Sequence, residues 1–443
     1  MAQKAIREAD GKKMIARLLK EYSAGKYSVE DKFVPVGPET DLAKLPTQYP
    51  WLKREKLVVK PDQIIKRRGK NKLILVGASF EDAKKWINDK RKGPITIYGK
   101  FDANGKPTDK GTTGQLTNFI IEPMVPHKES DECYVAITSN NDGDCILFYH
   151  QGGVNVGDVD AKASRLQVKI GTLPTQAEIE KALLGKVLAD RKKLVAGFIE
   201  SLFKFYADLN FAYLEINPIV VTKTAVTPLD LAAKLDDTGG FESAKKWGDI
   251  EFPTPFGRIL SPEEAYIEEL DSKTGASLKL TVLNPEGRVW TMVAGGGASV
   301  IFADTITDLG YMSEMSNYGE YSGDPNEEFT YKYAKTILDL MTRKKNPKGK
   351  VLLIGGGIAN FTDVANTFKG IIRALTEYQQ KLKENKVKIY VRRGGPNYKE
   401  GLKNMQDVGE KLGIPIEVYG PETHMTRIVK LALGRPGREL TWQ

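Results

Sequence analysis

Residues 213–236, YLEINPIVVTKTAVTPLDLAAKLD, decide the fold of the first half of the chain. Two apolar runs in this stretch are separated by a polar Thr-Lys-Thr, and Glu215, Asn217 and Asp230 interrupt them. Because an acidic group is costly to bury without a partner, such residues in strand-like sequence predict a nearby cation. Spacing alone favours a plain β-hairpin with one polar face. Oxygen ligands of this type also suit Mg²⁺, which keeps several waters and is completed by substrate phosphates.

Length and composition narrow the class of protein. The chain has 443 residues, of which 41% are hydrophobic and 28% charged, which predicts about three domains and excludes a disordered type. No apolar run approaches the roughly 20 residues of a membrane span, and the N-terminus has no apolar signal region. Only Cys133 and Cys145 occur, which excludes a disulfide framework and a CxxC metal site. We expect a soluble, cytoplasmic protein.

The charge balance points to acidic partners. Lysine and arginine number 66 against 57 acidic residues, a net charge of +9, which fits nucleic acid or anionic metabolites. The densest basic run, 65–70, lacks the interleaved aromatic residues of a single-strand binding surface. Anionic metabolites explain the charge as well, and nucleic-acid binding remains the weaker alternative.

The histidine count limits the chemistry. His127, His150 and His424 are the whole set, no HExxH occurs, and no serine or cysteine stands in a nucleophile motif. Covalent catalysis would therefore need an unusual nucleophile, or one from a partner.

The first half carries a candidate nucleotide site. Its patterns predict helices at 9–22, 80–90 and 192–209 and strands at 56–60, 72–76, 116–121, 133–138 and 145–150. Lys60 ends a predicted strand, and Arg68-Gly69 stands in the following turn. These cations could cradle a triphosphate, although a solvated basic loop explains them too. Backbone groups of residues 122–125 could bind an adenine, and the Glu132 carboxylate could bind ribose hydroxyls.

The segment 248–264, GDIEFPTPFGRILSPEE, is rich in proline and glycine and predicts a domain boundary. Beyond it, short strands alternate with helices, which predicts a parallel sheet with helices on both faces. The expected strands are 279–283, 289–293, 351–354, 387–391 and 416–419, and the expected helices are 300–309, 327–341, 364–383 and 398–412. The resulting domain prediction is 1–247, a linker at 248–264, 265–434, and a loosely ordered tail at 435–443.

Three predicted strands run into glycine-rich turns: AGGGAS at 294–299, GGGIANFT at 355–362 and RRGGPN at 392–397. Glycine permits close backbone approach, and helix N-termini attract anions. In an open parallel sheet, ligands bind outside the carboxyl ends of the strands. A tight turn explains any one of these glycine clusters. Three in one sheet, one with paired arginines, favour a site for a polycarboxylate or a phosphate.

Ten motifs follow one another along residues 4–434: VVKPDQIIKRRGK, EPMVPH, GGVNVGDVDAKA, YLEINP, LDLAAK, WGDIEFPTPFGR, VAGGGAS, NYGEYSG, GGIANFT and VRRGGPNY. In this order the sequence resembles the N-terminal half of the ATP-citrate lyase family, which is related to the β subunit of succinyl-CoA synthetase. The resemblance implies an ATP-grasp fold followed by a flavodoxin-like, CoA-ligase-type citrate-binding domain, α/β and α+β in class.

The resemblance also implies site residues. The ATP contacts would be Lys60, Arg68 and Gly69 at the phosphates, Pro123 and Val125 along the adenine, and Glu132 at the ribose. The Mg²⁺ positions would be Asn217 and Asp230, with a second set at Asp271, Thr274 and Ala276. The citrate contacts would be Gly323, Asn360, Thr362, Tyr378 and Arg393, beside a loop that contains Gly295 and Gly296. Two departures, TAVTP at 224–228 and an insert at 100–114, bear on loop geometry.

The implied reaction converts ATP, citrate and CoA to acetyl-CoA, oxaloacetate, ADP and phosphate. A larger partner subunit would carry the phosphohistidine, the CoA site and the citryl-CoA lyase module, so we expect a hetero-oligomer that binds neither membrane nor nucleic acid. The acetyl-CoA could serve lipid synthesis or carbon fixation. A β subunit of an acyl-CoA synthetase acting on succinate, and a non-catalytic sensor of ATP or citrate, remain alternatives.

Overall fold

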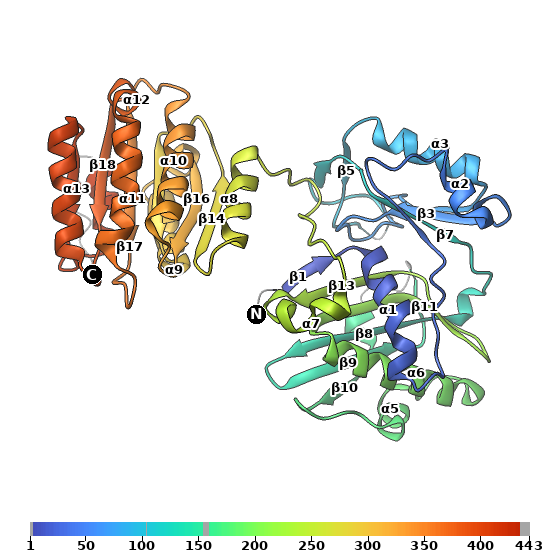
Figure 1. The fold of residues 1–443 in the computed structure, drawn as a ribbon. Coiled ribbons are helices and arrows are strands. Elements are labelled where there is room, and N and C mark those ends of the chain that lie inside the picture. The colour runs from blue at the N-terminus through green and yellow to red at the C-terminus, as the bar shows by residue number, and fades with distance from the viewer. Residues whose placement is uncertain (1–2, 103, 154–158, 435–443) are drawn as a thin grey trace. The chain divides into compact units, whose positions relative to one another are not determined.

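The chain folds into two compact units, Met1–Ile259 and Leu260–Gln443, in the computed structural model (Figure 1). The structure describes residues 3–102, 104–153 and 159–434, so the tail predicted at 435–443 lies outside the described residues. A split of this kind is expected because a chain of this length exceeds what one hydrophobic core can organise. Within the described ranges, none of the helices combines the length and apolarity needed to cross a membrane.

The larger sheet of the first unit is antiparallel, with strand order β1-β13-β11-β8-β9-β10 and with β12 paired to β11. Its strands are β1 (Gln3–Ile6), β8 (Glu132–Asn140), β9 (Gly143–Tyr149), β10 (Ser164–Val168), β11 (Phe211–Val221), β12 (Val226–Pro228) and β13 (Leu231–Asp236). The associated helices are α1 (Glu8–Tyr22), α4 (Val159–Lys162), α5 (Gln176–Leu183), α6 (Ala189–Asp208) and α7 (Gly240–Trp247). Burial alternates along β13, as a half-buried strand requires. The hairpin predicted within 213–236 is confirmed.

A smaller antiparallel sheet in the same unit has the order β2-β7-β3-β4. Its strands are β2 (Val34–Val36), β3 (Leu57–Pro61), β4 (Leu75–Ala78) and β7 (Phe119–Pro123), and a separate ribbon pairs β5 (Ile95–Ile97) with β6 (Thr112–Gly114). Helices α2 (Leu45–Gln48) and α3 (Phe80–Arg91) pack against this sheet (Figure 1). A reciprocal capping box between Ser79 and Asp82 fixes the start of α3.

The second unit contains a parallel sheet in the order β15-β17-β18-β19 and an antiparallel pair, β14 with β16. The strands are β14 (Ser277–Val282), β15 (Val289–Ala294), β16 (Asn317–Ser322), β17 (Lys350–Gly356), β18 (Val387–Arg392) and β19 (Ile416–Tyr419). The helices are α8 (Pro262–Ser272), α9 (Gly296–Asp308), α10 (Glu327–Thr342), α11 (Val364–Glu377), α12 (Gln379–Glu384), α13 (Tyr398–Leu412) and α14 (Arg427–Leu433). Short 3₁₀ turns in the two units are η1 (Pro50–Lys53), η2 (Glu129–Asp131), η3 (Asp237–Gly239) and η4 (Met312–Glu314).

Helices cover both faces of this parallel sheet, as the alternating pattern predicts. Phe368 of α11 and Met405 of α13 belong to the core on one face, and Phe302 of α9 and Ile428 of α14 belong to the core on the other. The β14–β16 pair joins the edge of the parallel sheet at β15. The Asn317 amide accepts from and donates to the backbone of Thr291 at 2.9 Å in each direction, and the Ser316 N–H donates to the Val289 carbonyl at 2.8 Å.

Three elements of the second unit differ from the sequence-based prediction. The helix expected over 364–383 is two helices, α11 and α12, which meet at Tyr378. Strand β16, which has no run of large apolar residues, pairs with β14 in place of the parallel partner expected for 279–283. Helix α8 starts at Pro262, inside the predicted linker, because Ser261 and Glu264 form a capping box there.

Candidate functional site

A cleft of about 720 Å³ lies between the two sheets of the first unit. Its volume falls in the range of small-molecule sites. The cleft-lining residues include these predicted nucleotide and metal contacts: Lys60, Pro123, Val125, Glu132, Asn217 and Asp230. They come from β3, from β7 and the segment after it, from β8 and from the stretch 213–236. The fold thus brings together groups that are up to 170 residues apart in sequence (230 − 60).

Asn217 and Asp230 face each other where β11 and β13 begin to pair. The Asn217 N–H donates to the Asp230 carbonyl at 3.0 Å, and the Asn217 Oδ1 accepts from the Gly153 N–H at 2.8 Å. Two oxygen-bearing side chains held side by side fit a magnesium ion that keeps most of its water ligands. Glu215, the third polar residue of the stretch, accepts a hydrogen bond from Tyr213 instead.

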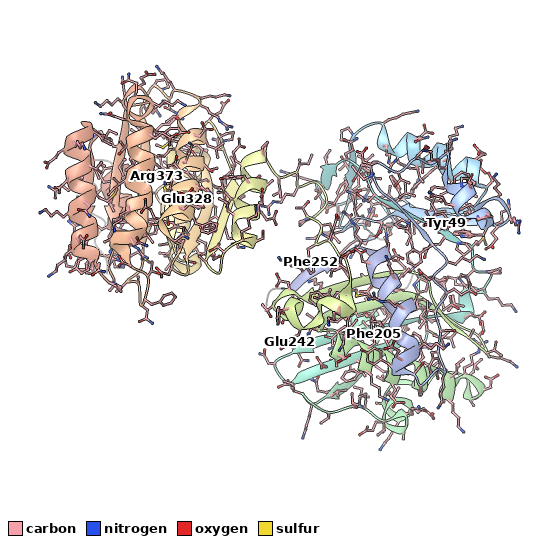
Figure 2. The ribbon with its side chains drawn as sticks, viewed as in Figure 1. Tyr49, Phe205, Glu242, Phe252, Glu328 and Arg373 are labelled. Atoms are coloured by element: carbon pink, nitrogen blue, oxygen red, sulfur yellow. The ribbon has the colours of Figure 1, made fainter. Side chains whose placement is uncertain are left out.

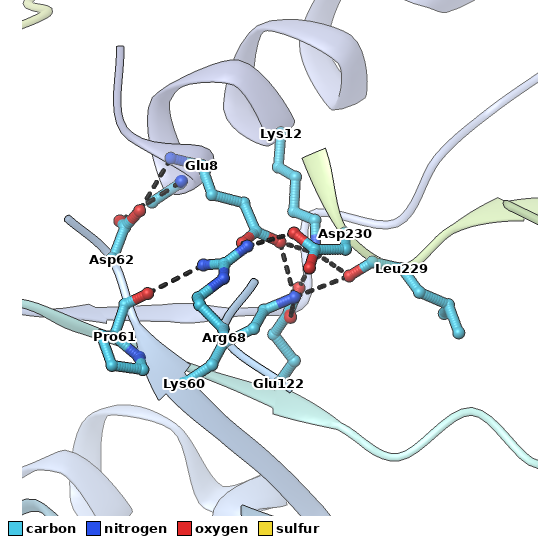
Figure 3. A network of polar contacts seen from close by, with 10 residues as sticks. Glu8, Lys12, Lys60, Pro61, Asp62, Arg68, Glu122, Leu229 and Asp230 are labelled. Carbon is cyan, nitrogen blue, oxygen red and sulfur yellow. Dashed lines mark hydrogen bonds and ion pairs between the residues drawn. The ribbon is translucent and has the colours of Figure 1, made fainter. Parts of the chain in front are cut away.

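Lys60 lies almost fully buried at the floor of the cleft, with 4% of its side chain exposed. Its Nζ is 2.6 Å from Oε1 of Glu8, 3.0 Å from Oε2 of Glu122 and 2.7 Å from the carbonyl of Leu229 (Figure 3). An ammonium has three N–H donors, so this arrangement uses all of them. Lys60 is therefore a buried, fully partnered cation rather than the solvated lysine of a basic loop.

Arg68 is buried too, although it stands in the densest basic run of the sequence. Its Nη1 donates to the Pro61 carbonyl at 2.8 Å, and its Nη2 donates to Oε2 of Glu8 at 2.6 Å and also to Oδ1 of Asp230 (Figure 3). The solvated-loop interpretation is thus wrong for Arg68. Gly69 follows in a turn, where its carbonyl accepts from the Lys72 N–H. Gly69 does not line the cleft.

Glu8 and Lys12 complete this charged network, and sequence reasoning missed both. The Lys12 Nζ is 2.8 Å from Oε1 of Glu8 and 2.8 Å from the Leu229 carbonyl, and it also bonds Glu122 (Figure 3). A signal for them exists in the sequence. Glu8 and Lys12 lie on the same face of α1 as the buried Ile15 and Leu19, since positions three, four and seven apart share a helix face.

The electrostatics of the network agree with its contacts. Burial alone would raise the pKa of Glu8, but Lys12, Lys60 and Arg68 outweigh it and hold that pKa well below its usual range. Burial would lower the pKa of Lys60, but the charges of Glu122, Glu8 and Asp230 reverse the effect and raise it. We therefore treat Glu8 as a carboxylate and Lys60 as an ammonium ion throughout the neutral pH range.

The predicted adenine and ribose contacts, Val125 and Glu132, line the cleft together with His127. The His127 Nδ1 lies 2.7 Å from the Val125 carbonyl, and its Nε2 lies 2.9 Å from Oε1 of Glu132. The other Glu132 oxygen packs against Gly153, where an added Cβ would come within 2.4 Å of Oε2. Gly153 also has a φ of +89°, so glycine is required there for two independent reasons.

The second predicted metal set, Asp271, Thr274 and Ala276, forms the connection between α8 and β14. Asp271 accepts from the Leu278 N–H at 2.8 Å and binds the Lys279 ammonium, and the Thr274 hydroxyl accepts from the Ala276 N–H at 3.1 Å. Both Asp271 oxygens already have protein partners, so a metal ion at this set would have to displace or share them. Among the residues that the structure describes, no cluster of three or more His, Cys, Asp or Glu side chains is arranged for a metal.

In the second unit, the glycine-rich ends of β15, β17 and β18 meet at one edge of the sheet. The three strands are parallel neighbours, with Ala294 opposite Gly356 and Ile354 opposite Val391. A further bridge joins Ile358 to Gly394 beyond the strand ends. The expected juxtaposition of these turns is therefore confirmed.

Arg393 is the charged centre of this edge. Its side chain is 5% exposed, and Nη1 donates to the Gly357 carbonyl at 2.7 Å. A Cβ on Gly356 would lie 2.7 Å from that nitrogen. Burial lowers the pKa of Arg393, and the only opposing neighbour of note is Tyr321, whose buried hydroxyl has no hydrogen-bond partner among the described residues. A buried cation beside an unsatisfied hydroxyl is suited to an anion.

Most of the predicted citrate contacts lie in the turns at the same edge of the sheet as Arg393. Gly295, with a φ of +105°, is the N-cap of α9, and Gly296 begins the helix. Asn360 and Thr362 lie in the turn after β17. The turn after β16, which contains Gly323, is linked to them because the Asp363 N–H donates to Asp324 at 3.3 Å.

Tyr378 is the exception, and its prediction as a citrate contact is corrected here. It is the C-cap of α11, whereas the anion edge lies at the other end of that helix, about 20 Å away for 14 residues. Its hydroxyl instead lies 3.4 Å from Asp339 at the end of α10. Tyr378 therefore braces two helices at the far edge of the sheet.

A nucleotide-sized cleft between two antiparallel sheets, followed by a parallel sheet with an anion-receptive edge, defines an ATP-grasp protein with an attached carboxylate-binding domain. Two family models match the chain, the ATP-citrate synthase ATP-grasp domain over residues 2–247 and the ATP citrate lyase citrate-binding domain over residues 258–435. The chain belongs to the ATP-citrate lyase family.

Full-length comparisons agree with this assignment. The human ATP-citrate synthase is 55% identical over 434 residues, which is 98% of this chain and 38% of the human protein. The Arabidopsis thaliana ATP-citrate synthase alpha chain protein 2 is 45% identical, over 98% of both chains. A solved structure of ATP citrate lyase from Methanothrix soehngenii, in complex with citrate and coenzyme A, superposes with a TM-score of 0.86 at 54% identity and covers 98% of this chain and 100% of that one. The chain thus spans well under half of the human relative.

Proposed function

We propose that this chain is the ATP- and citrate-binding half of an ATP-citrate lyase. The whole enzyme would convert ATP, citrate and CoA to acetyl-CoA, oxaloacetate, ADP and phosphate. The observation that carries the proposal is the buried cation cluster of Lys12, Lys60 and Arg68. Lys12 and Lys60 line the cleft together with Asn217 and Asp230, and Arg68 reaches the cleft through its ion pair with Asp230. Phosphoryl transfer depends on positioning and charge neutralisation, and this cluster offers both.

At the nucleotide site, Lys60 and Arg68 would bind the phosphates and hold them in line for transfer. Bound Mg²⁺ would neutralise part of the triphosphate charge, with Asn217 and Asp230 as its protein ligands. Arg68 already bonds Asp230. Asp230 and a phosphate oxygen are therefore alternative partners for one guanidinium, and nucleotide binding would draw Arg68 away from the carboxylate.

At the citrate site, Arg393 would bind a carboxylate of the substrate. Thr362 and Asn360, from the turn before α11, would donate to the remaining oxygens, and the N-terminal amides of α9 after Gly295 would favour negative charge. The buried Tyr321 hydroxyl would gain a partner when an anion enters. The Arg393 guanidinium is already bonded to the Gly357 carbonyl before any ligand binds, so it needs little reorganisation.

A partner would supply the covalent chemistry. His150 makes an edge-to-face contact with Tyr149, and His424 Nδ1 lies 3.0 Å from the Thr426 hydroxyl. His127 is engaged by Val125 and Glu132. None of the three stands in a recognisable nucleophile motif. We infer that a larger subunit carries the phosphohistidine, the CoA site and the citryl-CoA lyase module.

Reconstitution tests this proposal. The full chain, mixed with a purified large subunit of the family, should restore citrate cleavage that depends on ATP, Mg²⁺ and CoA, with oxaloacetate measured by a coupled assay. Arg393→Ala in the chain should abolish the restored activity, whereas Arg373→Ala, a surface arginine that pairs with Glu328 at 2.9 Å (Figure 2), should not. Activity with succinate but not citrate would identify an acyl-CoA synthetase subunit. Tight Mg·ATP binding without restored cleavage would identify a sensor.

A further inference from the structure

We propose that His127, as an imidazolium ion, is the positioning residue of the nucleoside subsite, and that it makes adenosine affinity fall as the pH rises. This rests on the proposed function, since it concerns the same nucleotide cleft. It goes beyond that function by naming a residue outside the phosphate and metal contacts and by assigning a proton to it.

The protonation state follows from what the two ring nitrogens face. Nδ1 is 2.7 Å from the carbonyl of Val125 and Nε2 is 2.9 Å from the carboxylate of Glu132. Neither a carbonyl nor an ionised carboxylate can donate a hydrogen. Both contacts are therefore satisfied together only when both nitrogens carry a proton, which is the imidazolium form.

The surroundings of His127 favour that form. Burial alone would lower the pKa of His127, but its hydrogen bonds to Glu132 and to the Val125 carbonyl, with the charges of Glu132 and Asp131, raise it above its ordinary value. Asp131 itself is paired with Arg191 at 2.9 Å, so Glu132 is the dominant anion. The other charged side chains that line the cleft are Lys12, Lys26, Glu30, Lys32, Lys60, Glu122 and Asp230.

The contacts of His127 fall on the two groups expected to hold a nucleoside. Glu132 is fixed on one side by His127 and on the other by the close approach of Gly153, which aims the carboxylate at the ribose hydroxyls. Val125 is the backbone group expected along the adenine, and His127 fixes the orientation of its carbonyl. When His127 loses its second proton, one of these bonds is lost, and a positive charge leaves the cleft at the same time.

The sign of the effect is fixed by the direction of the shift. Because the pKa of His127 is raised in the folded protein, the imidazolium is fully present at pH values below its ordinary pKa. It disappears as the pH rises through the raised one. If His127 had only a structural role, replacing it would change the stability of segment 125–132, but the affinity for the ribose would not depend on pH.

Calorimetric titration of the full chain with adenosine tests the proposal. Adenosine has no phosphate that titrates in this range, so its affinity reports the protein groups. In the wild type it should weaken about tenfold between about pH 6 and about pH 9, because one hydrogen bond to a charged group is lost. Inorganic tripolyphosphate cannot occupy the nucleoside subsite while it binds the cations. Its affinity should therefore be the same in the wild type and in variants of His127 at each pH.

Two variants separate the two ring nitrogens. His127→Gln places an amide N–H near the position of Nε2 and cannot titrate, so adenosine affinity should become independent of pH. His127→Asn places its amide near Nδ1 and loses the bond to Glu132. It should bind adenosine about tenfold more weakly at every pH and should discriminate less between adenosine and 2′-deoxyadenosine. His150→Gln is the matched control, because His150 lies in the same unit but does not line the cleft.

The outcomes distinguish this inference from the proposed function. A flat wild-type profile, or a pH dependence that survives in both His127 variants, overturns the role of His127 while nucleotide binding stands. Failure of the wild type to bind adenosine or Mg·ATP at any pH overturns the proposed function itself. Loss of the pH dependence in His127→Gln, with the control unchanged, supports the inference.

Discussion

The two proposed sites of this chain would meet the same demand, the binding of a polyanion, in different ways. In the first unit, cations and carboxylates form a closed network in which Lys60 and Arg68 already have partners. In the second unit, Arg393 has a backbone partner and faces the unsatisfied hydroxyl of Tyr321. A ligand at the first site must replace existing partners of Lys60 and Arg68. A ligand at the second site only adds partners to Arg393 and Tyr321.

This difference shows what stabilises each site. Buried ion pairs cost desolvation that their mutual attraction must offset, so the nucleotide cleft depends on the counter-ion that its cations share, Glu8. The citrate edge is organised by backbone geometry, which remains in place if one side chain is removed. Loss of Glu8 at the first site should therefore affect folding, whereas loss of Arg393 at the second should affect binding alone.

Glu8→Gln should produce the largest effect on stability. Glu8 is 4% exposed and contacts Lys12, Lys60 and Arg68, so neutralising it leaves buried cations without their shared counter-ion. We expect a loss of about 3–5 kcal/mol in the free energy of unfolding, measured by denaturant titration of the full chain. Glu21→Gln, an exposed residue on the same helix, should change it by less than about 0.5 kcal/mol. Equal effects of the two variants would contradict the closed network.

Asp62 should make the stability of the first unit depend on pH. Its carboxylate accepts from the Glu8 N–H at 2.7 Å and the Ala9 N–H at 3.3 Å at the start of α1. Burial, and then the charge of Glu8, raise its pKa to about 6, although Arg68 opposes them. The folded protein thus holds this proton more tightly than the unfolded chain does, so stability falls as the pH rises from about 4 to about 6.

Asp62→Asn should remove this part of the pH dependence. Asparagine keeps an acceptor for the helix amides but cannot ionise, so the difference in unfolding free energy between wild type and variant should change by up to about 3 kcal/mol across that window. Denaturant midpoints collected at several pH values measure it. A difference that stays constant across the window would show that Asp62 is already ionised at low pH in the folded state.

Arg393→Ala should separate binding from folding. We expect citrate affinity to fall about 10- to 100-fold, the contribution of one hydrogen-bonded charge, while Mg·ATP affinity and the unfolding midpoint stay close to those of the wild type. Arg373→Ala, on the exposed face of α11 and paired with Glu328 (Figure 2), controls for the loss of an arginine. A large drop in stability in Arg393→Ala would mean that the two sites are built alike after all.

Asp230→Asn should give the smallest change in affinity, but the direction of that change depends on whether Mg²⁺ is present. Without its carboxylate partner, Arg68 is free to bind phosphate, so nucleotide affinity in the absence of Mg²⁺ should rise about 3- to 10-fold. The additional affinity that Mg²⁺ confers should be lost. Fluorescence titration with ATP, with and without Mg²⁺, measures both effects. Weaker binding in both conditions would show that Arg68 and the metal do not share Asp230.

The sequence predicted the features that lie within short segments. The hairpin at 213–236 and the three glycine-rich strand ends carry local signals, either alternation of burial or glycine next to a helix start, and the structure confirms both. Strand β16 was missed because NYGEYS has no apolar alternation, and its pairing with β14 is set by tertiary context.

The charged network was less predictable because its members lie far apart in sequence. Glu8, Lys60, Glu122 and Asp230 come from four separate segments. The sequence analysis named Lys60, Arg68 and Asp230 as site residues but missed Glu8 and Lys12, whose signal is that they are charged residues on the buried face of α1. The prediction of Tyr378 as a citrate contact was wrong for a different reason. A residue-by-residue match to a family motif does not say at which end of a helix the residue lies, and the structure places it at the far one.

Calorimetry of the full chain with citrate and with Mg·ATP tests the central claim, that one chain holds two independent anion sites. We predict that both ligands bind, that Arg393→Ala weakens citrate alone, and that Asp230→Asn changes nucleotide binding alone. Binding of succinate without citrate, or the loss of both ligands from either single substitution, would contradict the account.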